Sequence, residues 1–258
     1  MVELPMILNE FLIYIIVGLV CGFVDSSLGM GYGVSATTVL ISFGITPAIA
    51  SASIHTSEGF VDIISGLSHW KFGNIQWNLF WKLILPGVLG AVLGAIFLSY
   101  LSLNFAKPFV SFILFFLGII ILIRFLFKQS TFTKQIPHKL IPIIGFIAAF
   151  IDISGGGGWG PILTPIFILN DLEPRRAIGT VEVTEPFISF AGVLTFGLLL
   201  GFESFLWALV IPLLIGGFIL TPIAAYLSKK VPKHLLGISV GLWLVILNLR
   251  TILMWIWQ

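Results

Sequence analysis

The fold class predicted for this 258-residue chain is an all-α integral membrane protein made of two inverted-topology repeats. Three observations predict it. Hydrophobic residues make up 58% of the chain, charged residues make up 9%, and the mean hydropathy is +1.13, far from the balance of a soluble domain. Two apolar segments are too short to span a bilayer, and the two halves of the chain repeat one another. Each half is predicted to hold a re-entrant broken-helix hairpin plus three transmembrane helices.

Charge and cysteine content limit the partners of the protein. The formal net charge is +2, and the basic residues are scattered over several loops. The sequence therefore has no cationic stripe for nucleic acid and no polybasic tail, so the lipid bilayer is the expected partner. A single cysteine, Cys21, allows no internal disulfide and is expected to be a buried packing residue.

Apolar segments of helical length follow one another along the chain. Their ranges are 8–25, 34–44, 47–70, 78–101, 106–126, 140–153, 161–170, 175–198, 204–228 and 235–256. The segments 34–44 and 161–170 would each be about 15 Å long as helices, which is half of a ~30 Å hydrocarbon core. We therefore expect these two segments to be half-helices.

Each half-helix follows a break that is rich in glycine. The first break lies in "FVDSSLGMGYGVSATTVL", residues 23–40, and the second in "SGGGGWGPILTP", residues 154–165. Non-helical backbone at membrane depth is tolerated only where protein buries it or where it lines an aqueous cavity. Glycine permits the turn, Gly160 is expected to cap the returning helix, and Pro161 suits its first position.

The two breaks are matched because the chain is duplicated. At a spacing of 127 residues, Asp25 falls on Asp152 and Gly31 on Gly158. Further matched pairs at this spacing are Ser27 with Ser154, Gly29 with Gly156, Gly33 with Gly160, Thr37 with Thr164 and Pro47 with Pro174. The predicted organisation is a first repeat over 1–127, a cytoplasmic linker over 128–138 and a second repeat over 139–258.

Basic residues orient the two halves, because cytoplasmic loops are enriched in Lys and Arg. The stretch 124–139 and the loop 229–233 are the most basic and are expected to be cytoplasmic. Both can be inside only if the broken segment 140–170 enters and leaves on the same side. The same rule places Lys71, Lys82, Arg175 and Arg176 inside. Both termini are then outside, in a multi-pass protein of the plasma (inner) membrane.

The start of a half-helix is a predicted anion site, since its N–H groups and its dipole favour negative charge. The sequence predicts free N–H groups near 31–35 and 158–162, facing one central cavity. The residues predicted to bind substrate are Ser27, Gly31, Tyr32, Gly33, Ser35, Ser53, His55, Ser154, Gly158, Trp159, Gly160 and Thr180. The alternative is that the glycines serve helix packing alone.

Ionisable residues line one face of the predicted helix 47–70. Intramembrane ionisable groups are costly and by default mark a transport pathway or a proton relay. The residues predicted to couple transport to protons or ions are Asp25, His55, Glu58, Asp62, Asp152, Glu182 and Glu185. For Asp25 and Asp152 the alternative of capping hairpin N–H groups stays open. The stretch 55–58, His-Thr-Ser-Glu, lacks the second histidine of a zinc-protease motif, so we expect no enzyme, metal or cofactor.

Two stretches resemble the TauE/SafE sulfite-exporter family, also called the toluene-sulfonate uptake permeases. They are "GGGGWGPILTPIFILNDLEPRRAIGTVEVTEP", residues 155–186, and the matched "GMGYG", residues 29–33. The resemblance covers almost the whole chain, although "DSSLGMGYG" and "ASASIHTSEGFVDIISG" depart from the family's usual first half. It implies the transport, export in particular, of sulfur-containing anions such as sulfite, sulfoacetate, other organosulfonates or thiosulfate.

Other functional classes stay open at this point. An anion channel would conduct rather than carry, and a scaffold would bind no anion. A cation-coupled carrier of another small metabolite would use the carboxylates Glu58, Glu182 and Glu185. The sequence also leaves open whether the protein forms a homodimer.

Overall fold

A computed structural model describes residues 4–127, 136–227 and 233–257. In this part of the chain every regular element is helical. The longer helices are α1 (Leu4–Leu28), α2 (Tyr32–Ser42), α3 (Pro47–Lys71), α4 (Trp77–Tyr100), α5 (Leu103–Leu126), α6 (Ile141–Gly155), α7 (Trp159–Leu169), α8 (Pro174–Leu200), α9 (Trp207–Leu227) and α10 (Lys233–Ile256). The prediction of an all-α membrane fold is confirmed, and each predicted apolar segment corresponds to one of these helices.

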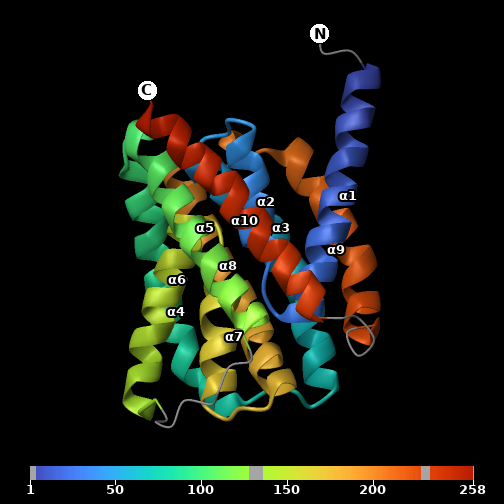
Figure 1. Ribbon diagram of the computed structural model, residues 1–258, viewed down its shortest axis with the longest axis vertical. Helices are drawn as coiled ribbons and strands as arrows, with labels where there is room; N and C mark the ends of the chain where they lie inside the picture. Colours follow the sequence, from blue (N-terminus) through green and yellow to red (C-terminus); the bar gives the residue numbers. More distant parts are fainter. Residues whose placement is uncertain (1–3, 128–135, 228–232, 258) are drawn as a thin grey trace.

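The two hairpins enter the bundle from opposite ends (Figure 1). Helix α1 runs inward from the end that carries both termini, and α2 returns toward that end. Helix α6 runs inward from the other end, and α7 returns toward it. The half-helices α2 and α7 have 11 residues each, which is about half of what a membrane crossing requires. Their starts therefore lie within the bundle.

Helices from the two halves pack against one another in matched pairs. Helix α1 packs on α9, and the equivalent helix α6 packs on α4. Helix α5 packs on its own equivalent, α10, and α3 packs on α8. Each hairpin is thus held by a long helix of the opposite half. This packing places the inner ends of both hairpins against α3 and α8, the helices that carry the ionisable residues.

The outer surface of the bundle suits a lipid environment. Five stretches of helix in the described residues are long and apolar enough to cross a membrane, namely 77–100, 103–126, 138–155, 174–200 and 237–256. Large apolar side chains such as Leu85, Leu198 and Ile246 point outward. Buried polar residues are instead concentrated on α3 and α8.

Basic residues lie near several of the described helix ends. Lys71 ends α3, Arg124 lies in the last turn of α5, and Arg175 and Arg176 begin α8. These helix ends share one end of the bundle, opposite the two termini (Figure 1). The linker residues 128–135 and most of the predicted cytoplasmic loop 229–233 lie outside the described residues. The cytoplasmic placement of this end, and the inverted orientation of the halves in a membrane, stay predictions.

Candidate functional site

Both hairpins turn through glycines with left-handed backbone. Gly29 has φ 67° and its match Gly156 has φ 74°, a conformation that favours glycine because a Cβ would be strained there. Gly31 is the residue before α2, and Gly158 is the residue before α7. The expectation that Gly160 caps α7 is therefore wrong. The helix begins two residues earlier than expected, at Trp159, and Pro161 is its third residue.

The two hairpin tips are in direct contact and are joined by two hydrogen bonds. The Thr37 hydroxyl donates a hydrogen bond to the Gly156 carbonyl at 2.5 Å, and the matched Thr164 hydroxyl donates to the Gly29 carbonyl at 3.0 Å. Backbone approaches backbone here, because a Cβ on Gly157 would lie 2.3 Å from the Val34 nitrogen. The glycines of the breaks thus permit a close contact between the hairpins as well as the turns.

Carboxylates occupy the N–H groups at both half-helix starts. The Tyr32 N–H donates to Asp25 Oδ1 at 3.2 Å, and the matched Trp159 N–H donates to Asp152 Oδ1 at 3.0 Å. Gly33 N–H donates to Glu58 Oε1 at 2.8 Å. These three N–H groups are therefore not free, contrary to the expectation from the sequence. Each helix start does bind carboxyl oxygens, the kind of acceptor that its dipole favours.

The aromatic residues of the tips are anchored in the same matched way. Tyr32 donates its phenol hydrogen toward Ser57 at 3.2 Å, and the Trp159 indole N–H donates to Thr184 Oγ1 at 3.2 Å. Both rings are fully buried. Tyr32 and Trp159 therefore hold the half-helices against α3 and α8 and are part of the wall around the tips.

Seven buried ionisable residues surround the tips, and they are the seven predicted to couple transport to ions. His55 Nε2 lies 3.3 Å from Asp152 Oδ2 and 3.8 Å from Glu58 Oε2. Asp25, Asp62 and Glu182 have carboxylate oxygens within 4.8 Å of one another. Glu58, Asp62 and Glu185 form a second such group, so Asp62 joins the two. The helices α1, α3, α6 and α8 together create this acidic centre.

Several residues predicted to bind substrate lie elsewhere or make other contacts. Ser53 accepts a hydrogen bond from Leu206 N–H, and its match Thr180 accepts one from Gln76 N–H. Both thus tie loops to the ends of long helices. The Ser154 hydroxyl donates to a carbonyl of its own helix, Ser35 is half-buried on α2, and the side chain of Ser27 lies outside the described residues.

The comparisons with known proteins agree with this architecture. The family model described as "Sulfite exporter TauE/SafE" matches residues 14–251. This chain belongs to the TauE/SafE family. It is also 43% identical over 252 residues to the "Probable membrane transporter protein YtnM" of Bacillus subtilis (strain 168), a match that covers 95% of this chain and 84% of that protein. No solved structure matches the chain. The protein is therefore a membrane transporter and not an enzyme.

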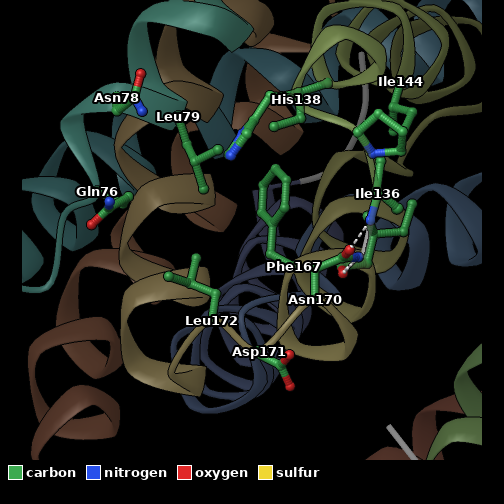
Figure 2. A pocket seen from close by; sticks show the side chains of 13 residues that line it. Gln76, Asn78, Leu79, Ile136, His138, Ile144, Phe167, Asn170, Asp171 and Leu172 are labelled. Carbon is green, nitrogen blue, oxygen red and sulfur yellow. Dashed lines mark hydrogen bonds between the residues drawn. The ribbon is translucent and has the colours of Figure 1, made fainter. Parts of the chain in front are cut away.

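In this TauE/SafE protein two cavities lie toward the ends of the bundle rather than at the tips. One, of about 410 Å³, lies where α6 begins and α7 ends (Figure 2). Asn170 projects into it and accepts a hydrogen bond from Ile136 N–H. The other, of about 300 Å³, lies beside Thr46 and Pro47 at the start of α3. None of the residues predicted to bind substrate lines either cavity.

The tip contacts include residues that sequence reasoning did not select. Thr37, Thr164 and Gly157 were absent from the predicted sites, although Thr37 and Thr164 are a matched pair in the repeat. Thr37 and Thr164 could have been selected from the sequence, because they are a matched pair of polar residues inside the two half-helices. Gly157 gave no such signal, because its role depends on the approach of the other hairpin.

Proposed function

We propose that this family member is a secondary transporter, of the exporter type, for sulfur-containing oxyanions such as sulfite or organosulfonates. The substrate would bind at the starts of α2 and α7, near the middle of the bundle. The coarser conclusion, a membrane transporter of the TauE/SafE family, does not depend on this assignment.

One observation carries the proposal: both half-helix starts already hold carboxylate oxygens, at 3.0 to 3.2 Å. A carboxylate and a sulfur oxyanion present similar negatively charged oxygens to N–H donors, and such hydrogen bonds are shorter and stronger than neutral ones. The side chains of Asp25 and Asp152 therefore stand where substrate oxygens would bind. A substrate would compete with them, and it would gain access when a proton or cation neutralises these carboxylates.

The charge of the centre favours a carrier over an open channel. An anion entering beside Asp25, Glu58 and Asp152 would meet like charges in a low-dielectric environment. The two hairpin tips also contact each other closely, since a Cβ on Gly157 would lie 2.3 Å from the Val34 nitrogen. Transport that is coupled to a cation gradient would satisfy both constraints.

The test is a flux assay in proteoliposomes with sulfite, an organosulfonate and thiosulfate, each with and without a proton gradient. Saturable flux of at least one of them, absent for chloride, is expected. Conductance that does not saturate would favour the anion channel. Flux of none of the three would reject the proposed substrate class.

A variant at the second tip makes the assay site-specific. A Cβ on Gly158 would lie 3.2 Å from Ile151 Cγ2, so Gly158→Val should fold after a small local shift. Its side chain would block the approach to the α7 start, and we expect at least tenfold weaker anion binding, about 1.4 kcal/mol. Gly44→Val, in a loop with open space around it but at a φ of +88° that strains valine, is the control for lost stability away from the tips. Unchanged affinity in Gly158→Val would place the anion elsewhere.

A further inference from the structure

Three carboxylates at the first hairpin share a buried position without a basic partner. Asp25 comes from α1, Asp62 from α3 and Glu182 from α8, and each is at most 4% exposed. One oxygen of each lies within 4.8 Å of the others. The ion pairs formed by the described residues do not include any of the three. Burying several carboxylates without a positive partner is costly, so some positive charge must accompany them.

Comparison of the two repeats shows that the first hairpin lacks the basic partner that the second hairpin has. At the second hairpin Asp152 lies 3.3 Å from the imidazole of His55. The residue that matches His55 in the other half is Glu182, and it lies beside Asp25, the match of Asp152. The aspartate of the second hairpin therefore faces a base from α3, whereas the aspartate of the first hairpin lies beside an acid from α8. The charge that balances Asp25 and Glu182, protons or a metal cation, comes from outside the chain.

Unsatisfied oxygens point into the same place. Both carboxylate oxygens of Asp62 and both of Glu182 are buried without a hydrogen-bond partner. The Ser65 hydroxyl, whose residue is 2% exposed, lies beside the Glu182 carboxylate and also has no hydrogen bond of normal geometry. Buried polar atoms are nearly always satisfied, so this group of five oxygens indicates a ligand.

The three carboxylate oxygens lie close enough together for one metal cation to contact all of them. Three atoms within 4.8 Å of one another share a point that is at most about 2.8 Å from each, and the 2.3–2.6 Å of Ca²⁺–oxygen bonds falls within that limit. Ca²⁺ accepts carboxylate and hydroxyl oxygens in a flexible geometry, whereas Mg²⁺ demands a near-ideal octahedron. We propose that Asp25, Asp62 and Glu182, with the Ser65 hydroxyl, form a binding site for a hard metal cation of the size of Ca²⁺ or Na⁺.

The position of this site gives it a mechanical consequence. Asp25 also accepts the hydrogen bond from Tyr32 N–H at the start of α2. A cation bound to Asp25 neutralises the carboxylate at that helix start. The transported anion can then approach the same N–H groups without repulsion from Asp25. The site itself does not depend on which anion is transported.

Titration of the purified protein in detergent tests the site without any transported anion. The protein is washed with chelator and titrated separately with CaCl₂ and NaCl, with choline chloride holding the ionic strength constant. Calorimetry and the melting temperature are followed. We expect saturable binding and a higher melting temperature with one of the two cations. The titration that gives this response shows whether the site binds a Ca²⁺-like or a Na⁺-like cation. A response in neither arm beyond that of choline would overturn the proposal and leave protons as the neutralising charge.

Variants assign the binding to these residues. Glu182→Gln and Asp62→Asn should each weaken cation affinity at least tenfold, whereas Glu203→Gln, in an exposed loop, should not change it. Glu182→His recreates the arrangement of the other half and should abolish the cation-dependent rise in melting temperature. If a variant does not fold, the wild-type titration and the remaining variants still decide. Equal affinity in wild type and Glu182→Gln would reject the site, and this result is independent of any flux assay with sulfite.

Discussion

The two hairpins have the same architecture and opposite electrostatics. In both, a glycine turn precedes an 11-residue half-helix whose first N–H is bound by an aspartate. At the second hairpin the aspartate is paired with His55, and at the first it lies beside Glu182. The repeat thus preserves the backbone of the site, while two matched positions, His55 with Glu182 and Asp62 with Ser189, change the charge that the site can hold.

This difference suggests a division of roles within one transporter. The second hairpin, whose aspartate has an internal partner, would stay neutral without a bound cation. The first hairpin would become neutral only when a cation or protons arrive. An anion could then be admitted to the tips in one cation state and repelled in the other, which is a requirement for coupled transport. The predictions below test whether the two hairpins differ in this way.

The largest expected effect is all-or-none labelling of cysteines. It tests whether the outer ends of the two hairpins lie on opposite sides of the membrane. In a Cys21→Ser background, Phe43→Cys at the exit of α2 should react with a membrane-impermeant thiol reagent only from outside. Glu173→Cys at the exit of α7 should react only from the cytoplasm. Both positions are exposed. Labelling of both from the same side would rule out the inverted arrangement of the hairpins.

The next largest effect is at the contact between the tips. Gly157→Ala would place a Cβ 2.3 Å from the Val34 nitrogen, at a φ of +142°, so overpacking and strain should together cost about 3 kcal/mol. Gly31→Ala would meet only the Val24 side chain, at 2.9 Å, and should cost less. Thermal unfolding in detergent measures both. Gly73→Ala, with positive φ and open space, isolates the strain. Equal losses at Gly157 and Gly73 would show that the tips do not touch.

A third pair of variants compares the aspartates directly, in buffer without metal cations. Asp152→Asn keeps an acceptor for Trp159 N–H but removes the partner of His55, and breaking a buried pair should cost about 3 kcal/mol. Asp25→Asn keeps an acceptor for Tyr32 N–H and removes one of three crowded charges. We expect it to cost under about 1 kcal/mol. Similar losses of unfolding free energy in the two variants would remove the electrostatic contrast.

The fold could be predicted from the sequence to a large extent, because the bilayer restricts the possible structures. Half-helices were predicted at 34–44 and 161–170 and are found as 32–42 and 159–169. The shift of two residues arises because each helix starts directly after the glycine turn, with Tyr32 or Trp159 as its first residue. Bilayer thickness, helical rise and the repeat sufficed to find the elements.

The candidate site could be predicted only as a set of residue types. Spacing along α3 indicated that His55, Glu58 and Asp62 share a face, and they do surround the tips. The sequence did not show which carboxylate faces which partner. That His55 faces Asp152 while Glu182 faces Asp25 depends on how α3 and α8 pack across the two halves. Occupation of the helix starts by the protein's own carboxylates depends on the same packing.

The smallest expected effect concerns the two hydroxyls that join the tips. Thr37→Val and Thr164→Val each remove one hydrogen bond, and such bonds in membrane proteins contribute about 0.6 kcal/mol on average. Thr37, whose bond is 2.5 Å long rather than 3.0 Å, should show the larger loss. Thr195→Val is the control, because this hydroxyl bonds only to Ala191 of its own helix.

The double variant shows whether the hairpins act as one unit. Both hydrogen bonds fix the same interface, so loss of the first should loosen the second, and the two effects on unfolding free energy should differ from their sum by about 0.5 kcal/mol. Because Thr37 belongs to one hairpin and Thr164 to the other, such coupling means that a change at either tip is felt at both. A cation at the first hairpin could then influence the second. If the two changes in unfolding free energy are strictly additive, the hairpins respond independently. The electrostatic difference between them could then not be transmitted from one hairpin to the other during transport.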